Sequence, residues 1–167
     1  HRIRTPDPLP TMNLPWRLIL ASASPRRRQL LTGLDLPVVV TSTDVDETPP
    51  PGLPILHVAE HLAVKKARAY HRPIAADQVL ITADTTVIVD DVLLNKPTDD
   101  ADARRMLGML AGRTHQVVTG VCLRTAERTI SFADTAEVTF APLTAEEINY
   151  YVQRHSPLDK AGAYGVQ

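Results

Sequence analysis

The sequence predicts a mixed α/β fold, and two features of its pattern indicate this. Short apolar segments rich in β-branched residues alternate with segments in which apolar residues recur at helical spacing. Two longer strand-like segments, 116–123 and 130–140, are separated only by a short polar turn, which predicts an antiparallel hairpin. The 167 residues, of which 44% are hydrophobic, are enough for one domain with a buried core.

The chain begins with a polar, proline-rich stretch that predicts no fixed structure. Residues 1–15 contain Pro6, Pro8, Pro10 and Pro15 and show no periodicity. They also lack the apolar centre of a signal peptide. We therefore expect a disordered extension over 1–15 and one folded domain over 16–167.

A strand, a turn and a helix follow, and they bring three arginines together. Residues 18–21 predict a buried strand, Ser24 is a good helix N-cap, and Pro25 suits the first helical position. The helix macrodipole disfavours cations in a first turn by about 0.3–1 kcal/mol each, yet residues 26–28 are all arginine. An anion held by the helix N-terminus, the serine hydroxyls and the guanidinium groups would explain them. The alternative is a solvated basic turn.

The central part of the chain predicts two more strands and a long helix. Residues 37–41 predict a strand, 48–54 a proline-rich loop, and 57–71 a helix with Lys66 near its middle. Residues 79–89 read as β structure throughout, and Asp84 stands inside this apolar, β-branched run. An unpaired buried carboxylate is costly, so Asp84 is a functional candidate from the residues alone.

Capping signals mark the later helices. Asp99 precedes apolar residues at helical spacing, and Gly112 ends that helix. Thr144 and Glu147 form a capping box before a further helix, and residues 155–167 predict a loop.

Composition excludes several classes of function. The net charge of −1 argues against a general nucleic-acid binder, and no apolar run reaches the roughly 18 residues that span a membrane. The single cysteine, Cys122, permits no disulfide within the chain, which fits a reducing, cytoplasmic setting. The sequence has no P-loop and no zinc-ligand spacing.

Several patterns, in order, resemble those of the Maf family of nucleoside triphosphate pyrophosphatases. They are SxSPRR at 22–27, DE at 46–47, AxxKA at 63–67, ADTTV at 83–87, KP at 96–97, GRxHxVxTG at 112–120 and DKAGxYGxQ at 159–167. The resemblance implies a Maf/ITPase-like fold: an elongated mixed sheet, helices on both sides, and an active-site cleft between two lobes. Family members continue beyond the glutamine with a strand and a helix, so we also expect that this chain lacks them.

The resemblance also implies roles for individual residues. Asp84 becomes the catalytic proton acceptor, and Glu47 and Asp84 become ligands of Mg²⁺ or Mn²⁺. The remaining substrate-binding candidates are Ser22, Ser24, Arg26, Arg27, Lys66, Thr85, Lys96, Lys160 and Gln167. Without the resemblance, each of the three lysines is more simply explained as a solvated surface charge.

The identity of three positions points to one branch of the family. Arg27, Thr85 and Gln167 match the dTTP/UTP pyrophosphatases rather than the 7-methyl-GTP branch. We therefore expect hydrolysis of dTTP, UTP and modified pyrimidine nucleotides to the monophosphate and pyrophosphate. The alternatives are a 7-methyl-GTP pyrophosphatase and a non-catalytic, nucleotide-binding regulator of septum formation. The expected partner is the nucleotide, not nucleic acid or a membrane, and a homodimer is possible.

Overall fold

The computed structural model describes residues 16–165 of the chain. The predicted N-terminal extension, residues 1–15, and the predicted specificity residue Gln167 lie outside this range. Within it, no helix is both long enough and apolar enough to cross a membrane.

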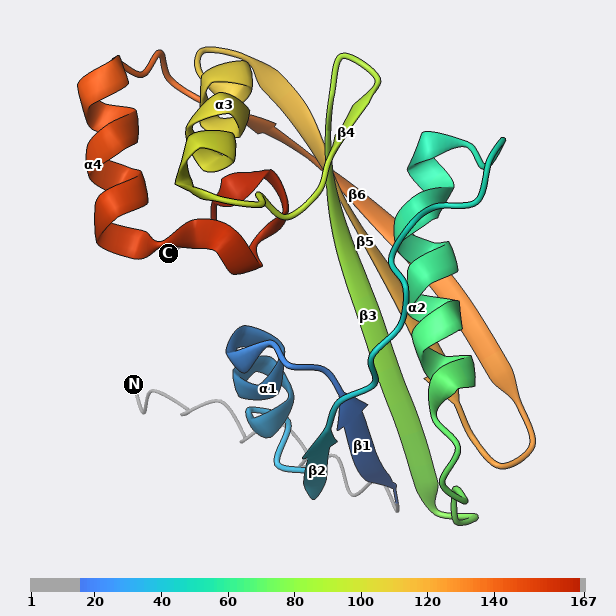
Figure 1. Cartoon of the computed structure of the whole chain (residues 1–167). Helices are drawn as coiled ribbons and strands as arrows, with labels where there is room; N and C mark the ends of the chain where they lie inside the picture. Colours follow the sequence, from blue (N-terminus) through green and yellow to red (C-terminus); the bar gives the residue numbers. More distant parts are fainter. Residues whose placement is uncertain (1–15, 166–167) are drawn as a thin grey trace, which may run out of the picture.

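A mixed sheet of six strands forms the centre of the molecule (Figure 1). The strands are β1 (Arg17–Ala21), β2 (Val38–Thr41), β3 (Gln78–Val89), β4 (Val92–Leu94), β5 (Thr114–Arg124) and β6 (Thr129–Thr139). Their order is β2-β1-β3-β5-β6, and β4 pairs with the end of β3. β1 is parallel to β2 and β3, whereas β5 and β6 form the predicted antiparallel hairpin. The mixed α/β class is therefore confirmed.

Three of the four helices begin where their capping residues predict, and α2 begins without a side-chain cap. They are α1 (Pro25–Thr32), α2 (Val58–Ala69), α3 (Asp100–Leu110) and α4 (Ala145–His155), with short 3₁₀ turns η1 (Ile55–His57), η2 (Pro157–Asp159) and η3 (Ala161–Ala163). The side chains of Ser24 and Asp99 each accept a backbone N–H of the first turn. Thr144 and Glu147 form the complete capping box of α4.

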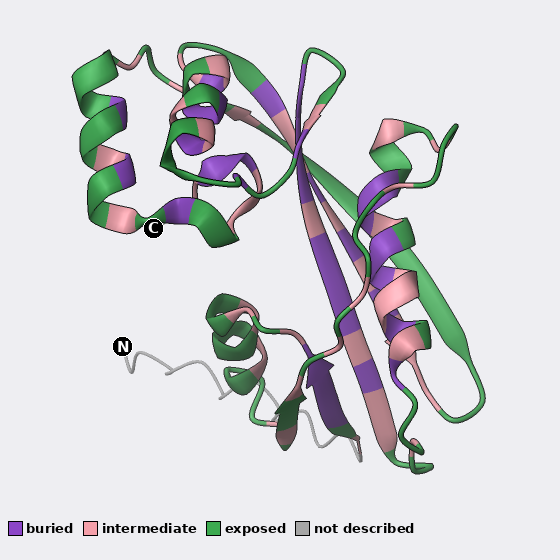
Figure 2. Cartoon of the chain, viewed as in Figure 1, coloured by how far each residue is buried: buried purple, intermediate pink, exposed green. Residues whose placement is uncertain are grey.

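Side chains of β3 alternate between the two covered faces of the sheet. Leu80 packs with α2 on one face, and Val87 and Val89 pack with α3 and α4 on the other. α2 and the α3–α4 pair lie on opposite sides of the sheet, and buried residues follow these contacts (Figure 2). The expectation of helices on both sides is confirmed. Because β3 has twelve residues, it carries both groups of elements, with β1 paired to its first part and β4 to its last.

Helix α2 is attached to the sheet at several points. Thr82 Oγ1 donates to the Ala63 carbonyl at 2.6 Å. A Cβ added at Gly120 of β5 would lie 2.3 Å from the backbone of Ala59, so only glycine permits this approach. Arg124 Nη1 donates to the carbonyls of Ala67 and Tyr70, at 2.9 and 3.1 Å, at the C-terminal end of α2.

Replacing Arg124 by methionine should destabilise the fold by about 1–3 kcal/mol, because two carbonyls lose a charged donor at a helix C-terminus. Urea unfolding measures this free energy. Arg128→Met is the matched control, since Arg128 is exposed in the β5–β6 turn. Equal midpoints for the two variants would show that the Arg124 contacts contribute nothing to stability.

The apolar side of α1 differs from expectation. The spacing of Leu30, Leu31 and Leu34 predicts a packed face, yet Leu30 is 66% and Leu34 45% exposed. No residue of α1 is buried (Figure 2). The reason is positional, because α1 lies beside β2, a four-residue strand at the edge of the sheet.

Candidate active site

The turn after β1 has the geometry of an anion site. Ser22 Oγ accepts the N–H of Ser24 at 3.1 Å, and Ser24 Oγ accepts the N–H of Arg27 at 3.3 Å. Each hydroxyl keeps its own proton for donation to a ligand. A hollow of about 450 Å³ opens here at the carboxyl ends of β1 and β2, where open α/β sheets usually bind ligands. Arg26 is exposed in the same first turn.

Asp84 lies in the middle of β3, and its side chain is directed to the α2 side of the sheet. It is 7% exposed, and Lys66 Nζ of α2 contacts its Oδ1 at 3.0 Å. Burial raises the pKa of Asp84, and the nearby Lys66 charge opposes that shift only in part. A carboxylate with a raised pKa accepts a proton more readily than an ordinary surface aspartate.

Lys66 joins the two predicted metal ligands. Its Nζ lies 3.3 Å from Glu47 Oε1 as well as 3.0 Å from Asp84 Oδ1. Lys96 Nζ lies 3.7 Å from the other oxygen of Glu47. The loop before α2, the helix itself and the segment after β4 thus supply one cluster of alternating charges.

Arg27 approaches the same part of β3 from α1. Its Nη1 donates to the Ala83 carbonyl and its Nη2 to Thr85 Oγ1, both at 3.1 Å. Burial lowers the pKa of Arg27, and the charges of Asp84 and Glu47 oppose that effect. Because side chains alternate along a strand, Thr85 lies on the face opposite to Asp84. Through the hydrogen bond between Arg27 and Thr85, two of the three predicted specificity residues contact each other.

Lys160, another predicted substrate-binding residue, forms its ion pair with Asp159 and not with the cluster. Its Nζ contacts Asp159 Oδ1 at 3.0 Å. The hydrogen bond from Lys160 lowers the pKa of Asp159, and the charge of Lys96 adds to this shift. The N–H of Gly162 donates to the Asn95 carbonyl at 3.3 Å, which ties this C-terminal segment to the residue before Lys96.

Comparison with known proteins identifies the family. The family described as "Maf-like protein" matches residues 17–167. The chain belongs to the Maf family. Proteins described as dTTP/UTP pyrophosphatase match it in Phocaeicola vulgatus, with 47% identity over 91% of this chain and 79% of the relative, and in Porphyromonas gingivalis, with 48% over 91% and 78%. A protein of the same description in Bacillus mycoides is 43% identical over 90% of this chain and 78% of its own.

A solved structure supports the fold. The Ham1 protein of Staphylococcus aureus superposes with a TM-score of 0.52 at 18% identity, covering 72% of this chain and 70% of its own. At that identity, the likeness concerns the fold alone.

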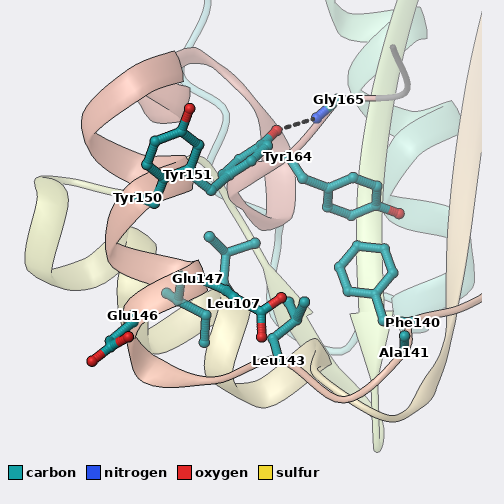
Figure 3. Close-up of a pocket in the computed structure, with 11 residues that line it drawn as sticks. Leu107, Phe140, Ala141, Leu143, Glu146, Glu147, Tyr150, Tyr151, Tyr164 and Gly165 are labelled. Carbon is teal, nitrogen blue, oxygen red and sulfur yellow. Dashed lines mark hydrogen bonds between the residues drawn. The ribbon is translucent and has the colours of Figure 1, made fainter.

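The second, larger hollow of this Maf-family chain is mostly apolar and contains none of the predicted site residues (Figure 3). Its volume is about 640 Å³, and Leu107, Phe140 and Tyr164 are among its lining residues. Near it, Gly165 N–H donates to the Tyr151 hydroxyl at 3.4 Å. The charged cluster along β3, rather than this hollow, is the candidate active site.

Sequence reasoning missed several contributors to the site. The Ala83 carbonyl accepts from both Arg27 and Lys66, and nothing in a sequence marks a backbone oxygen. Gly120 stands in a family pattern, but its contact with α2 is visible only in space. His115 is buried and pairs through Nε2 with the Tyr164 hydroxyl at 2.6 Å. Burial lowers the pKa of His115.

Proposed function

We propose that this Maf-family chain hydrolyses nucleoside triphosphates, chiefly dTTP and UTP and also modified pyrimidine nucleotides, to the monophosphate and pyrophosphate. The observation that carries the proposal is Asp84, a buried carboxylate with a raised pKa that contacts Lys66 and lies near the charge of Arg27. The descriptions of the bacterial relatives support the same activity. We place the enzyme in the cytoplasm, where nucleotides are made; a homodimer stays a prediction.

The residues divide into a proton acceptor and a set of phosphate ligands. Asp84 takes the proton of the attacking water, which displaces pyrophosphate at the α phosphorus. The guanidinium groups of Arg26 and Arg27 bind phosphate in bidentate fashion, each donating two hydrogen bonds to phosphate oxygens. The hydroxyls of Ser22 and Ser24 donate to the same anion, and Lys66, Lys96 and Lys160 add point charges.

Glu47 and Asp84 suit a divalent cation by the chemistry of their donors. Mg²⁺ is usually held by one or two carboxylates together with substrate phosphates and water. Within residues 16–165, no group of three or more His, Cys, Asp or Glu side chains is placed to hold a metal ion. A cation held by Glu47 and Asp84 would take its remaining oxygen ligands from substrate phosphate and water. Mg²⁺ or Mn²⁺ would neutralise phosphate charge and polarise the phosphoryl group.

Selectivity for pyrimidine nucleotides is assigned to Arg27, Thr85 and Gln167. The contact between Arg27 Nη2 and Thr85 Oγ1 holds the guanidinium at the edge of β3. A hydrogen-bonding site rejects a base that leaves its polar groups unpaired. We therefore expect the polar groups of these three residues to favour the bases of dTTP and UTP over that of 7-methyl-GTP.

A screen for pyrophosphate release tests the proposed function. Standard and modified triphosphates are incubated with the protein and Mg²⁺ or Mn²⁺, and both products are identified. We expect pyrophosphate with dTMP or UMP, loss of turnover in EDTA, and recovery when metal is restored. Release of inorganic phosphate with a diphosphate would contradict the cleavage site. Full activity in EDTA would remove Glu47 and Asp84 from the role of metal ligands.

A further inference from the structure

The ammonium group of Lys66 occupies the position between the two predicted metal ligands. Three oxygens surround its Nζ: Asp84 Oδ1 at 3.0 Å, Glu47 Oε1 at 3.3 Å and the Ala83 carbonyl at 3.4 Å. The Lys66 side chain is only 13% exposed, so solvent contributes little to its stabilisation. Lys96 differs, because its side chain is 55% exposed and its ammonium lies 3.7 Å from the second oxygen of Glu47, Oε2.

We propose that Lys66 acts as an internal cation that excludes divalent metal until nucleotide binds. This inference rests on the proposed function. Mg²⁺ and Mn²⁺ need the carboxylate oxygens that the ammonium now contacts, and Mg²⁺ binds oxygen at about 2.0–2.1 Å. A divalent ion and the ammonium would also repel each other strongly at such distances in a partly buried site.

The triphosphate resolves this competition. Its negative charge offers Lys66 a second set of oxygen partners, and the flexible four-carbon stem of lysine lets the ammonium move to them. Glu47 and Asp84 are then free for the metal that accompanies the nucleotide. Metal binding is therefore weak in the nucleotide-free protein and strengthens when nucleotide is present, because each ligand removes an obstacle to the other.

A Mn²⁺ titration without nucleotide tests the inference independently of turnover. Free Mn²⁺ is followed by electron paramagnetic resonance with the wild-type protein, Lys66→Met and Lys65→Met. Lys65 is the matched control, because it is the adjacent residue of α2 and its Nζ donates to the Asp46 backbone carbonyl at 2.6 Å. We expect roughly tenfold or more tighter Mn²⁺ binding for Lys66→Met, since the competing charge is gone from the carboxylates. Lys65→Met should stay within about twofold of wild type, because the Lys65 ammonium contacts a backbone carbonyl and not the carboxylate oxygens of Glu47 or Asp84.

Three further measurements keep the result interpretable. In Lys66→Met/Asp84→Asn, the gain in Mn²⁺ affinity should disappear. If circular dichroism shows that Lys66→Met is unfolded, Lys66→Gln replaces it. In the wild type, a non-hydrolysable dTTP analogue should tighten Mn²⁺ binding.

Unchanged or weaker Mn²⁺ binding by the folded Lys66 variant would overturn the inference, as would an equal gain in Lys65→Met. A wild-type protein that hydrolyses no triphosphate would overturn the proposed function instead, and the Mn²⁺ affinities of the variants would distinguish the two failures.

Discussion

Asp84→Asn should abolish turnover of dTTP while nucleotide binding is largely retained. Asparagine keeps the shape of the side chain but cannot accept the proton of water, and it is a poor metal ligand. Loss of a general base typically lowers the rate by a factor on the order of 10²–10⁴, and loss of the metal ligand adds to this. Pyrophosphate release measures kcat, and equilibrium binding of a non-hydrolysable analogue measures affinity.

The melting temperature of Asp84→Asn shows whether its loss of turnover is a loss of chemistry or a result of misfolding. The pKa of Asp84 is raised because burial disfavours its charged form. The folded state therefore binds this proton more strongly than the unfolded state, and the associated stability is lost as pH rises through the raised pKa. At neutral pH in metal-free buffer, the neutral amide should not lower the melting temperature. Asp134→Asn, at an exposed position of β6, is the control with native activity. A native rate for Asp84→Asn would exclude Asp84 as the proton acceptor.

The elements could be predicted because their signals are local. Ser24, Asp99 and Thr144 cap their helices as their positions predict, and Gly112 has the positive φ of +65° that ends a helix. Alternation and β-branching predicted the strands for the same reason. The exposed face of α1 could not be foreseen, because a helical pattern does not show which neighbour covers it.

The sequence predicts a site residue where a charged side chain stands in an apolar segment. Asp84 stands out because a carboxylate inside an apolar strand needs compensation. The position of Lys66 between Glu47 and Asp84 depends instead on how α2 lies across β3, and three separate segments must be placed before it can be seen. The register of helix on sheet is a property of packing, and spacing along the chain does not encode it.

Gly120→Ala should strongly destabilise the protein and lower its activity together. A Cβ at this position would lie 2.3 Å from the carbonyl carbon of Ala59 and from the N of Glu60, which are backbone atoms that cannot rotate away. Helix α2 would have to move off the sheet, at a cost of about 1–3 kcal/mol or more. Because Lys66 belongs to the same helix, that movement also disturbs its contact with Asp84. Melting temperature and kcat/KM for dTTP measure the two effects.

Gly108→Ala is the matched control for Gly120→Ala, because it makes the same substitution at a position where a Cβ has room. Gly108 lies inside α3, and a Cβ added there meets nothing within 4 Å. Alanine in an open helical position stabilises by about 0.5–1 kcal/mol, since it restricts the unfolded chain and favours the helix. The same chemical change should therefore raise the melting temperature at residue 108 and lower it at residue 120. If Gly120→Ala keeps native stability and native kcat/KM, then α2 does not rest on β5 as closely as the structure places it, and the position of Lys66 beside Asp84 would need another support.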